Sequence, residues 1–350
     1  MRINYKDKIR AISVLLTIVI VSCKPSIITA QKSLQGIKSF ELLGNDIYPE
    51  GICIDTENGT IYTGSINGKG IQKTLHGNTK YLLKPSNSVV SDNILGMAVD
   101  DPNNRLWVCS NNLGAFFQNQ SGEPKLSILN TDSGKLIRSI EKKDFSPDFN
   151  PLFGDVVTDS KGNAYVTNLA STAIIKVSDD FSEIEVWEDF PKAPDGKFYI
   201  LNGLDVSANG ENLIVATYKT GYEGALATLF KVNTKNGDIS EIDCNDSVED
   251  FKINGIDGLA FVNDSTLVGV SGNGKLLRIS MSNNLTKATI QVISTGTKAE
   301  SILLEPSTVA LFDGKLYTTN SQANRFFSGK PPSLPFMIME IPLDIIGLNQ

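Results

Sequence analysis

Histidine is nearly absent from this chain: His76 is the only one among 350 residues, and it lies in a loop-like Leu-His-Gly-Asn segment. The sequence contains neither the His-Glu-x-x-His motif of zinc hydrolases nor the Gly-x-Ser-x-Gly motif of a nucleophile elbow. Cysteine is also scarce, with four residues and no Cys-x-x-Cys spacing. These absences argue against a histidine-based catalytic site, a cysteine-based zinc site and a disulfide framework.

An excess of basic residues is also lacking, because 32 Lys and Arg face 39 Asp and Glu. Four of the basic residues and only one of the acidic residues lie within positions 1–22, so without that segment the net charge falls to about −10. We therefore expect no nucleic-acid partner. The hydrophobic content of 41% and charged content of 20% are those of an ordinary globular protein with a large core.

The N-terminus has the pattern of an export signal. A basic start precedes an apolar run at 11–21, which is short for a membrane span but suits the core of a secretory signal peptide over 1–22. Ile20-Val21-Ser22-Cys23 resembles the lipobox of bacterial lipoproteins, in which the cysteine is diacylated and becomes the first mature residue. The alternative is an ordinary signal peptide cleaved near Thr29-Ala30-Gln31.

Lipidation of Cys23 would supply more than one buried acyl chain, as stable membrane anchoring requires. Residues 23–36 would then be the lipidated terminus and a short polar tether, and 37–350 the folded domain. We expect an exported bacterial lipoprotein on the periplasmic or cell-surface side of a membrane, the outer membrane by preference, which contacts lipid through this anchor only.

Three cysteines are left in the mature chain, and they are scattered. Cys53 and Cys109 each stand in an apolar run, which predicts two small buried residues on strands, with a bridge between them as the less favoured alternative. Cys244 has no obvious partner.

One strand-turn-strand pattern recurs six times. In its clearest copy, Leu204 and Val206 alternate with polar residues, Asn209-Gly210 supplies a tight turn, and 213–215 is a second apolar run. The copies occupy 49–64, 95–109, 153–168, 201–216, 256–270 and 306–320, at steps of 45 to 59 residues.

Repeats with a period near fifty residues are typical of propeller blades. Further strand-like segments follow each copy, as a four-stranded blade requires, and Ser39–Leu43 is expected to join the C-terminal strands in one blade and so close the ring. The sequence therefore predicts an all-β, six-bladed β-propeller without substantial helices. An open β-solenoid or two β-sandwich domains would not repeat the same strand-turn-strand sequence pattern at this period.

The six innermost strands should bring equivalent residues together at the axis. At the slot before the recurring glycine, the copies carry Glu50, Leu95, Gly154, Asn202, Asp257 and Ser307. Two carboxylates and an amide oxygen form a hard-oxygen set suited to a divalent cation, Ca²⁺ first and Zn²⁺, Mn²⁺ or Mg²⁺ as alternatives, whose charge would relieve the repulsion between the carboxylates. The competing interpretation is that these residues only cap turns.

These residues carry a resemblance to a family. Glu50-Gly51, Asn202-Gly203-Leu204-Asp205 and Asp257-Gly258 resemble the metal triad of the senescence marker protein, gluconolactonase and luciferin-regenerating-enzyme-like family of six-bladed propellers. The resemblance implies a divalent metal held by Glu50, Asn202 and Asp257, and hydrolysis of a small-molecule lactone or related ester. It also implies that the metal polarises the carbonyl while Asp257 is the catalytic base, with a metal-held hydroxide as the alternative.

The third copy departs from that family, whose lactonases place an asparagine where this chain has Gly154 followed by Asp155. Asp155 is expected either to face the channel or to be a turn residue. Arg325, in a loop after the sixth copy, is a candidate to orient an anionic substrate, and the alternative is a solvated loop arginine. Tyr218 and Tyr199 either line the substrate pocket or pack in the core.

A second class of function stays open at this level. The chain could be a non-catalytic surface lipoprotein that holds a structural metal and uses a propeller face as a binding platform. Such a platform predicts an aromatic-rich face, and the aromatic content of 8% gives no sign of one. A monomer is expected in either case.

Overall fold

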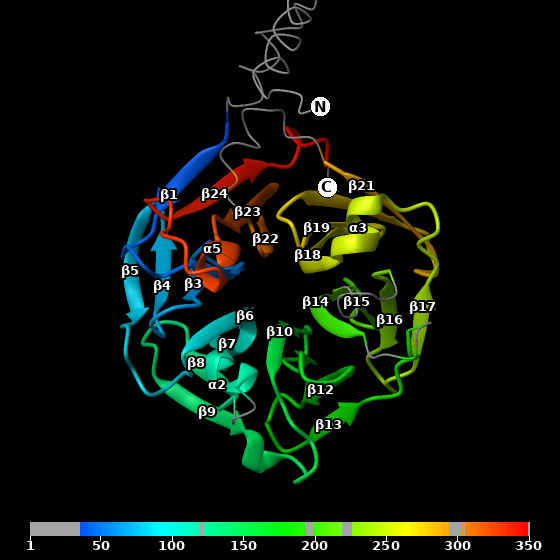
Figure 1. The fold of residues 1–350 in the computed structure, drawn as a ribbon, viewed down its shortest axis with the longest axis horizontal. Coiled ribbons are helices and arrows are strands. Elements are labelled where there is room, and N and C mark those ends of the chain that lie inside the picture. Colours follow the sequence, from blue (N-terminus) through cyan, green and yellow to red (C-terminus); the bar gives the residue numbers. More distant parts are fainter. Residues whose placement is uncertain are drawn as a thin grey trace, which may run out of the picture.

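The computed structural model describes residues 36–118, 122–193, 196, 199–218, 226–293, 303 and 305–348. These residues form six four-stranded antiparallel sheets arranged around a central axis (Figure 1). The predicted all-β, six-bladed propeller is therefore confirmed. The signal segment, Cys23 and the tether up to residue 35 lie outside the described residues.

The strands of each blade run in chain order from the axis outward. Blade one holds β2 (Pro49–Ile54), β3 (Ile61–Ser65), β4 (Ile71–Leu75) and β5 (Asn78–Leu83); blade two holds β6 (Asn93–Asp100), β7 (Arg105–Asn111), β8 (Lys125–Asn130) and β9 (Leu136–Glu141); blade three holds β10 (Phe153–Thr158), β11 (Ala164–Asn168), β12 (Ala173–Val177) and β13 (Ile184–Trp187). Blade four holds β14 (Ile200–Val206), β15 (Asn212–Tyr218), β16 (Leu229–Asn233) and β17 (Ile239–Ile242); blade five holds β18 (Ile256–Asn263), β19 (Thr266–Ser271), β20 (Leu276–Met281) and β21 (Ala288–Val292).

The sixth blade closes the ring. It holds β22 (Val309–Phe312), β23 (Lys315–Thr319) and β24 (Met337–Pro342) from the C-terminal part of the chain, and its outer strand is β1 (Lys38–Glu41) from the N-terminal part. Strand β1 pairs antiparallel with β24, so Lys38 lies opposite Glu340 (Figure 1). This is the closure predicted from the strand-like segment at Ser39–Leu43.

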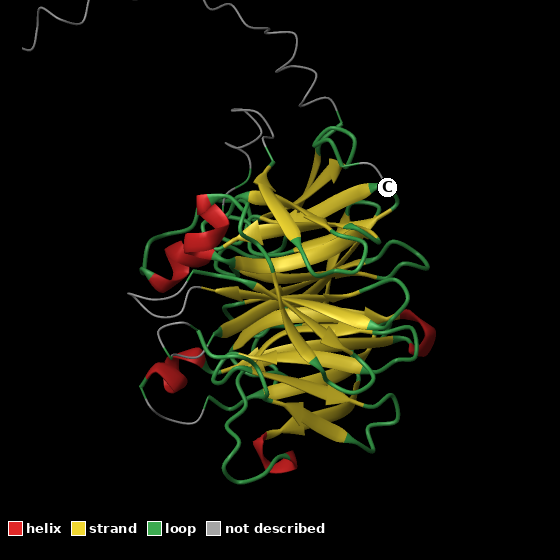
Figure 2. Cartoon of the chain, turned by 90° about the vertical axis from the view of Figure 1, so that its right-hand side faces the viewer, coloured by secondary structure: helices red, strands yellow, loops and turns green. Residues whose placement is uncertain are grey.

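Short helices lie in the connections between strands, and most of them project from one face of the ring (Figure 2). They are α2 (Leu113–Phe117), α3 (Glu249–Asn254), α5 (Ala323–Phe327) and the 3-10 turns η1 (Asp101–Asn103) and η2 (Lys142–Asp144). Helix α5 replaces the loop expected after the sixth copy. No helix among the described residues is long and apolar enough to cross a membrane.

The core lies between adjacent blades, because each sheet buries both of its faces. Ile174 packs with blade four and Ile175 with blade two, and both are fully buried. Successive side chains of a strand point to opposite faces of its sheet. Because both faces of a blade are covered by neighbouring blades, its strands need continuous apolar runs and not alternating apolar and polar residues. Cys53 and Cys109 are buried in these interfaces as free thiols, as expected, and Cys244 is free as well.

The innermost strands share a further irregularity. Register shifts interrupt the first ladder of five blades, between Pro49 and Ile52, Ile94 and Met97, Phe153 and Val156, Leu201 and Leu204, and Ile256 and Leu259. A bulge turns side chains out of the regular alternation and is frequent beside functional sites. In each case the two skipped residues are those of the slot and glycine positions identified in the sequence.

Candidate functional site

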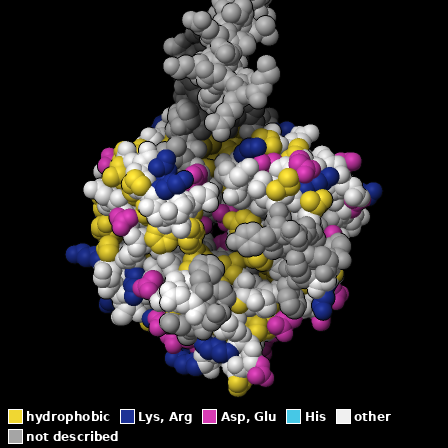
Figure 3. Space-filling model, viewed as in Figure 1, with side chains coloured by type: hydrophobic (Ala, Val, Ile, Leu, Met, Phe, Trp, Pro, Cys, Tyr) yellow, Lys and Arg dark blue, Asp and Glu magenta, His cyan; other side chains and the backbone are white. Residues whose placement is uncertain are grey.

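A cavity of about 380 Å³ opens at the centre of the ring. Leu113 of α2 and Phe327 of α5 line it, so its mouth is on the face that carries these two helices. Figure 3 shows the hollow at the centre of that face, with acidic side chains inside it and hydrophobic side chains around it. Its volume lies within the range of small-molecule sites, about 300 to 1,000 Å³.

The bulges aim the predicted residues into this cavity. Glu50, Asn202 and Asp257 each occupy the first position of a bulge, and all three line the cavity. The glycines that follow allow the inner strands to approach one another: a Cβ on Gly203 would lie 2.4 Å from the backbone oxygen of Asp257. Glycine at this slot is therefore what lets three separate blades present side chains to one small space.

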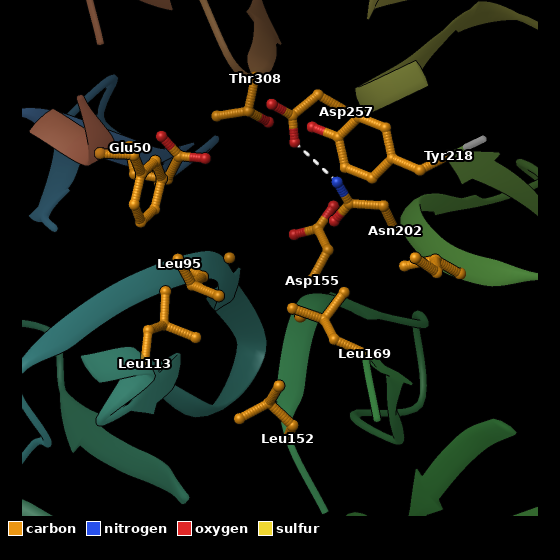
Figure 4. Close-up of a pocket in the computed structure, with 16 residues that line it drawn as sticks. Glu50, Leu95, Leu113, Leu152, Asp155, Leu169, Asn202, Tyr218, Asp257 and Thr308 are labelled. Carbon is orange, nitrogen blue, oxygen red and sulfur yellow. Dashed lines mark hydrogen bonds between the residues drawn. The ribbon is translucent and has the colours of Figure 1, made fainter. Parts of the chain in front are cut away.

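Hydrogen bonds fix the orientation of these side chains (Figure 4). The amide Nδ2 of Asn202 donates to Oδ1 of Asp257 at 2.7 Å, and the ring of Tyr218 lies beside the Asp257 carboxylate. On the opposite side, Ser321 donates to Oε2 of Glu50 at 2.7 Å. Because the Asn202 nitrogen is held by Asp257, its amide oxygen is left to face the cavity.

The electrostatics of the cavity are those of uncompensated negative charge. Burial raises the pKa of Glu50, and burial followed by the charge of Glu50 raises the pKa of Asp257 well above its usual range. No Lys, Arg or His is among the described residues that line the cavity. Within the described part of the chain, the cavity lining therefore supplies no positive group to balance these carboxyls.

Asp155 is the third carboxyl in the cavity, so of its two predicted placements the channel-facing one is observed. In blade three the glycine comes first, and Asp155 takes the position that is glycine in four other blades. Its carboxylate accepts hydrogen bonds from the backbone N–H groups of Val156, at 2.9 Å, and of Leu204 in the next blade. Burial, opposed by these two hydrogen bonds, raises its pKa to about 7, and the charges of Asp205 and Glu50 contribute to the rise.

Of the other residues predicted to bind substrate, some line the cavity and some do not. Tyr218 lines the cavity, whereas Tyr199 is buried in the core, where its ring meets Phe230. Arg325 is not among the described lining residues, and its Nη1 donates to the backbone oxygen of Pro331 at 3.0 Å.

Sequence reasoning missed two polar residues of the site. Thr308 lines the cavity at the glycine position of the sixth copy, a departure visible in the alignment of the copies. Ser321, which holds Glu50, is 271 residues away from it in the chain, and no pattern joins the two. The apolar lining residues other than Leu95, which come from loops, a strand end and the helices α2 and α5, were also missed.

The donor set can be compared with what a cation needs. Carboxylate oxygens of Glu50 and Asp257 and the amide oxygen of Asn202 are hard donors of the kind that Ca²⁺ binds. Within the described ranges no three His, Cys, Asp or Glu side chains form a ligand cluster by themselves, so any such site here has to include the amide. The chemistry of the donors fits a divalent cation, whose charge would lower the pKa of both carboxyls.

Comparison with known proteins shows that other proteins share this fold. No protein-family model matches the chain, and no curated protein matches it in sequence. Solved structures do match. They include the major allergen Mala s 1 of Malassezia sympodialis, with a TM-score of 0.67 and 15% identity over 89% of this chain and 98% of that one. A gluconolactonase from Xanthomonas campestris matches with a TM-score of 0.55 and 14% identity, over 87% and 89% of the two chains.

A luciferin-regenerating enzyme matches with a TM-score of 0.55 and 13% identity, over 87% of this chain and 95% of that one. The fold is shared with both enzymes. The resemblance stated from the triad is thus confirmed for the architecture. At these identities the likeness extends to the fold alone, and function has to be reasoned from the cavity.

Proposed function

We propose that this protein is a divalent-metal-dependent hydrolase of lactones or related esters. The observation that carries the proposal is the convergence of Glu50, Asn202 and Asp257, from three blades, in one cavity whose described lining contains no basic residue. Such a set is costly unless a cation joins it, since buried carboxylates without a partner repel each other. The gluconolactonase and the luciferin-regenerating enzyme that share the fold support an enzymatic interpretation.

Glu50, Asn202 and Asp257 would hold the cation, with Ca²⁺ as the first candidate. When bound, the cation would polarise the substrate carbonyl and stabilise the negative charge that develops on its oxygen. Asp257 would accept the proton of the attacking water and return it to the ring oxygen as the acyl C–O bond breaks. The hydrogen bond from Asn202 holds its carboxylate in place for this proton transfer. Ser321 would keep the Glu50 carboxylate in place.

A hydrolysis screen tests this function. The full-length protein would be assayed by pH-stat on sugar, aliphatic and aryl lactones, first as purified, then with EDTA, and then with Ca²⁺, Mn²⁺, Zn²⁺ or Mg²⁺ restored in excess. We expect turnover of at least one lactone that EDTA abolishes and a cation restores. Absence of turnover on every lactone, with every cation, would refute the enzymatic proposal and leave the non-catalytic platform as the better account.

We further propose that Cys23 anchors the protein to a membrane as an exported lipoprotein. The support is the lipobox-like sequence Ile20-Val21-Ser22-Cys23 after an apolar run of signal-peptide length.

A further inference from the structure

The central cavity has two chemically different halves (Figure 4). Glu50, Asp155, Asn202, Tyr218, Asp257 and Thr308 lie on one side of it, and Leu95, Leu113, Leu152 and Leu169 on the other. The polar half is where the proposed chemistry takes place. The apolar half has no part in that chemistry, so its composition bears on what else of the substrate the cavity receives.

The apolar half is a built wall. Leu113 and Leu152 are buried, and the backbone beside them is clamped by buried asparagines. Asn168 Oδ1 accepts from the N–H of Leu152 at 2.6 Å, and Asn111 exchanges two hydrogen bonds with the backbone of Phe153. A wall held in this way is preformed, so apolar groups can pack on it without first ordering the protein.

Two further apolar residues of the cavity are exposed to solvent. Ile200 of β14 and Phe327 of α5 line the cavity and are 37% and 56% exposed. Exposed apolar side chains beside a cavity are typical of a ligand-binding groove. An apolar substituent on a ring held at the polar half would therefore lie along leucines and leave past Ile200 and Phe327.

The same lining disfavours the other lactone classes. A sugar lactone carries several hydroxyl groups, and leucine side chains can neither donate nor accept the hydrogen bonds that these groups would lose on leaving water. An anionic lactone would meet three carboxyls and no basic residue among the described lining residues. Arg325, the cation considered for that task, lies outside that lining and donates to Pro331.

We propose that the substrate is an uncharged lactone or ester with a medium-length alkyl or aryl substituent, which packs on the wall formed by Leu95, Leu113, Leu152 and Leu169. This inference rests on the proposed hydrolase function for its reactive group, and on the apolar wall for its substituent. The cavity volume of about 380 Å³ suits a medium-sized molecule rather than a long-chain lipid.

A chain-length series tests the substituent. With the full-length protein and a cation in excess, kcat/KM would be measured for δ-valerolactone, δ-hexalactone, δ-octalactone, δ-nonalactone and glucono-δ-lactone. Burial of each methylene should raise kcat/KM about fourfold, and glucono-δ-lactone should be slower than δ-nonalactone by 100-fold or more. Faster turnover of glucono-δ-lactone, or no gain with chain length, would overturn the inference while leaving the hydrolase function intact.

A variant pair connects the series to the wall. Leu169→Gln should cut the ratio of kcat/KM for δ-nonalactone over δ-valerolactone about tenfold, because it places an amide on the wall, and Leu169→Met should keep that ratio within twofold. Circular dichroism of both variants would show that they fold. An unchanged ratio in the folded Gln variant would refute the placement of the substituent against Leu169.

Binding separates this inference from the hydrolase proposal. Calorimetry with 2-heptylcyclopentanone, a ring carbonyl that cannot be hydrolysed, should give binding at least 100-fold tighter than cyclopentanone, with a negative heat-capacity change. Tight binding without any lactone turnover would uphold the apolar site and refute the hydrolase. Equal or absent binding of the two ketones would refute the apolar site, whatever the lactones do.

Discussion

Asp205 offers a test of how burial and hydrogen bonding compete at the centre of the ring. Asp205 lines a smaller cavity that shares Gly51 and Asp155 with the first one. Its carboxylate accepts hydrogen bonds from the N–H of Val206 at 2.8 Å and of Phe261, in the next blade, at 2.7 Å. These bonds favour the charged form, yet burial outweighs them and raises the pKa to about 6. The perturbation we consider is Asp205→Asn, which removes the titrating group.

The magnitude follows from the pKa difference between the folded and unfolded states. An unfolded aspartate titrates near 3.9, so between about pH 4 and pH 6 the folded protein binds a proton here that the unfolded chain does not. The free energy of unfolding contributed by Asp205 is therefore complete below pH 4 and lost as the pH rises through 6. A difference of about two pKa units corresponds to about 3 kcal/mol.

Urea unfolding at a series of pH values between 4 and 8 would measure the effect, with EDTA present and the fluorescence of Trp107 and Trp187 as the signal. We expect the free energy of unfolding of the wild type, relative to that of Asp205→Asn, to fall by 1 to 3 kcal/mol from pH 4 to pH 7. Asp264→Asn, at an exposed turn, is the charge-matched control. A difference that rises with pH would mean that the two backbone N–H groups outweigh burial, and it would refute the reasoning.

Two further perturbations test the packing and the anchor. Gly203→Ala should destabilise the protein by about 1 to 3 kcal/mol and reduce hydrolysis, since the new Cβ would lie 2.4 Å from the backbone oxygen of Asp257. Gly114→Ala, whose Cβ would approach nothing closer than 3.6 Å, is the control in the same urea assay. Equal stability of the two variants would contradict the close approach of the strands. Cys23→Ala should move the protein from the membrane to the soluble fraction in cell fractionation, because the acylated residue is removed, and a variant that stays with the membrane would contradict the lipoprotein proposal.

Much of the fold could be predicted from the sequence because a propeller repeats its information. The strand-turn-strand sequence pattern recurs in every blade, and the apolar runs of strands such as β12 follow from burial on both faces. The N-terminal strand was recognisable as a strand-like segment ahead of the first copy, which can join the C-terminal strands in one blade. The proximity of Glu50, Asn202 and Asp257 could be predicted because equivalent positions of a ring converge on its axis.

The rest of the cavity could not be predicted in this way, because it departs from the repeat. The orientation of Asp155 depends on a bulge in which glycine and the acidic residue have exchanged places, and two interpretations were equally open until the register was known. Leu113, Leu152 and Leu169 stand outside the aligned strands, where there is no equivalent position to compare. The contact between Ser321 and Glu50 crosses the closure of the ring.

The most direct test of the central claim is the rate of Asp257→Asn on the best lactone, with the cation in excess. Asparagine keeps the size of the side chain and one oxygen at this position, but it cannot accept the proton of water. If Asp257 is the catalytic base at the centre of the ring, kcat should fall at least 100-fold, while circular dichroism shows that the variant is folded. A folded variant that retains kcat within threefold of the wild type would contradict the account.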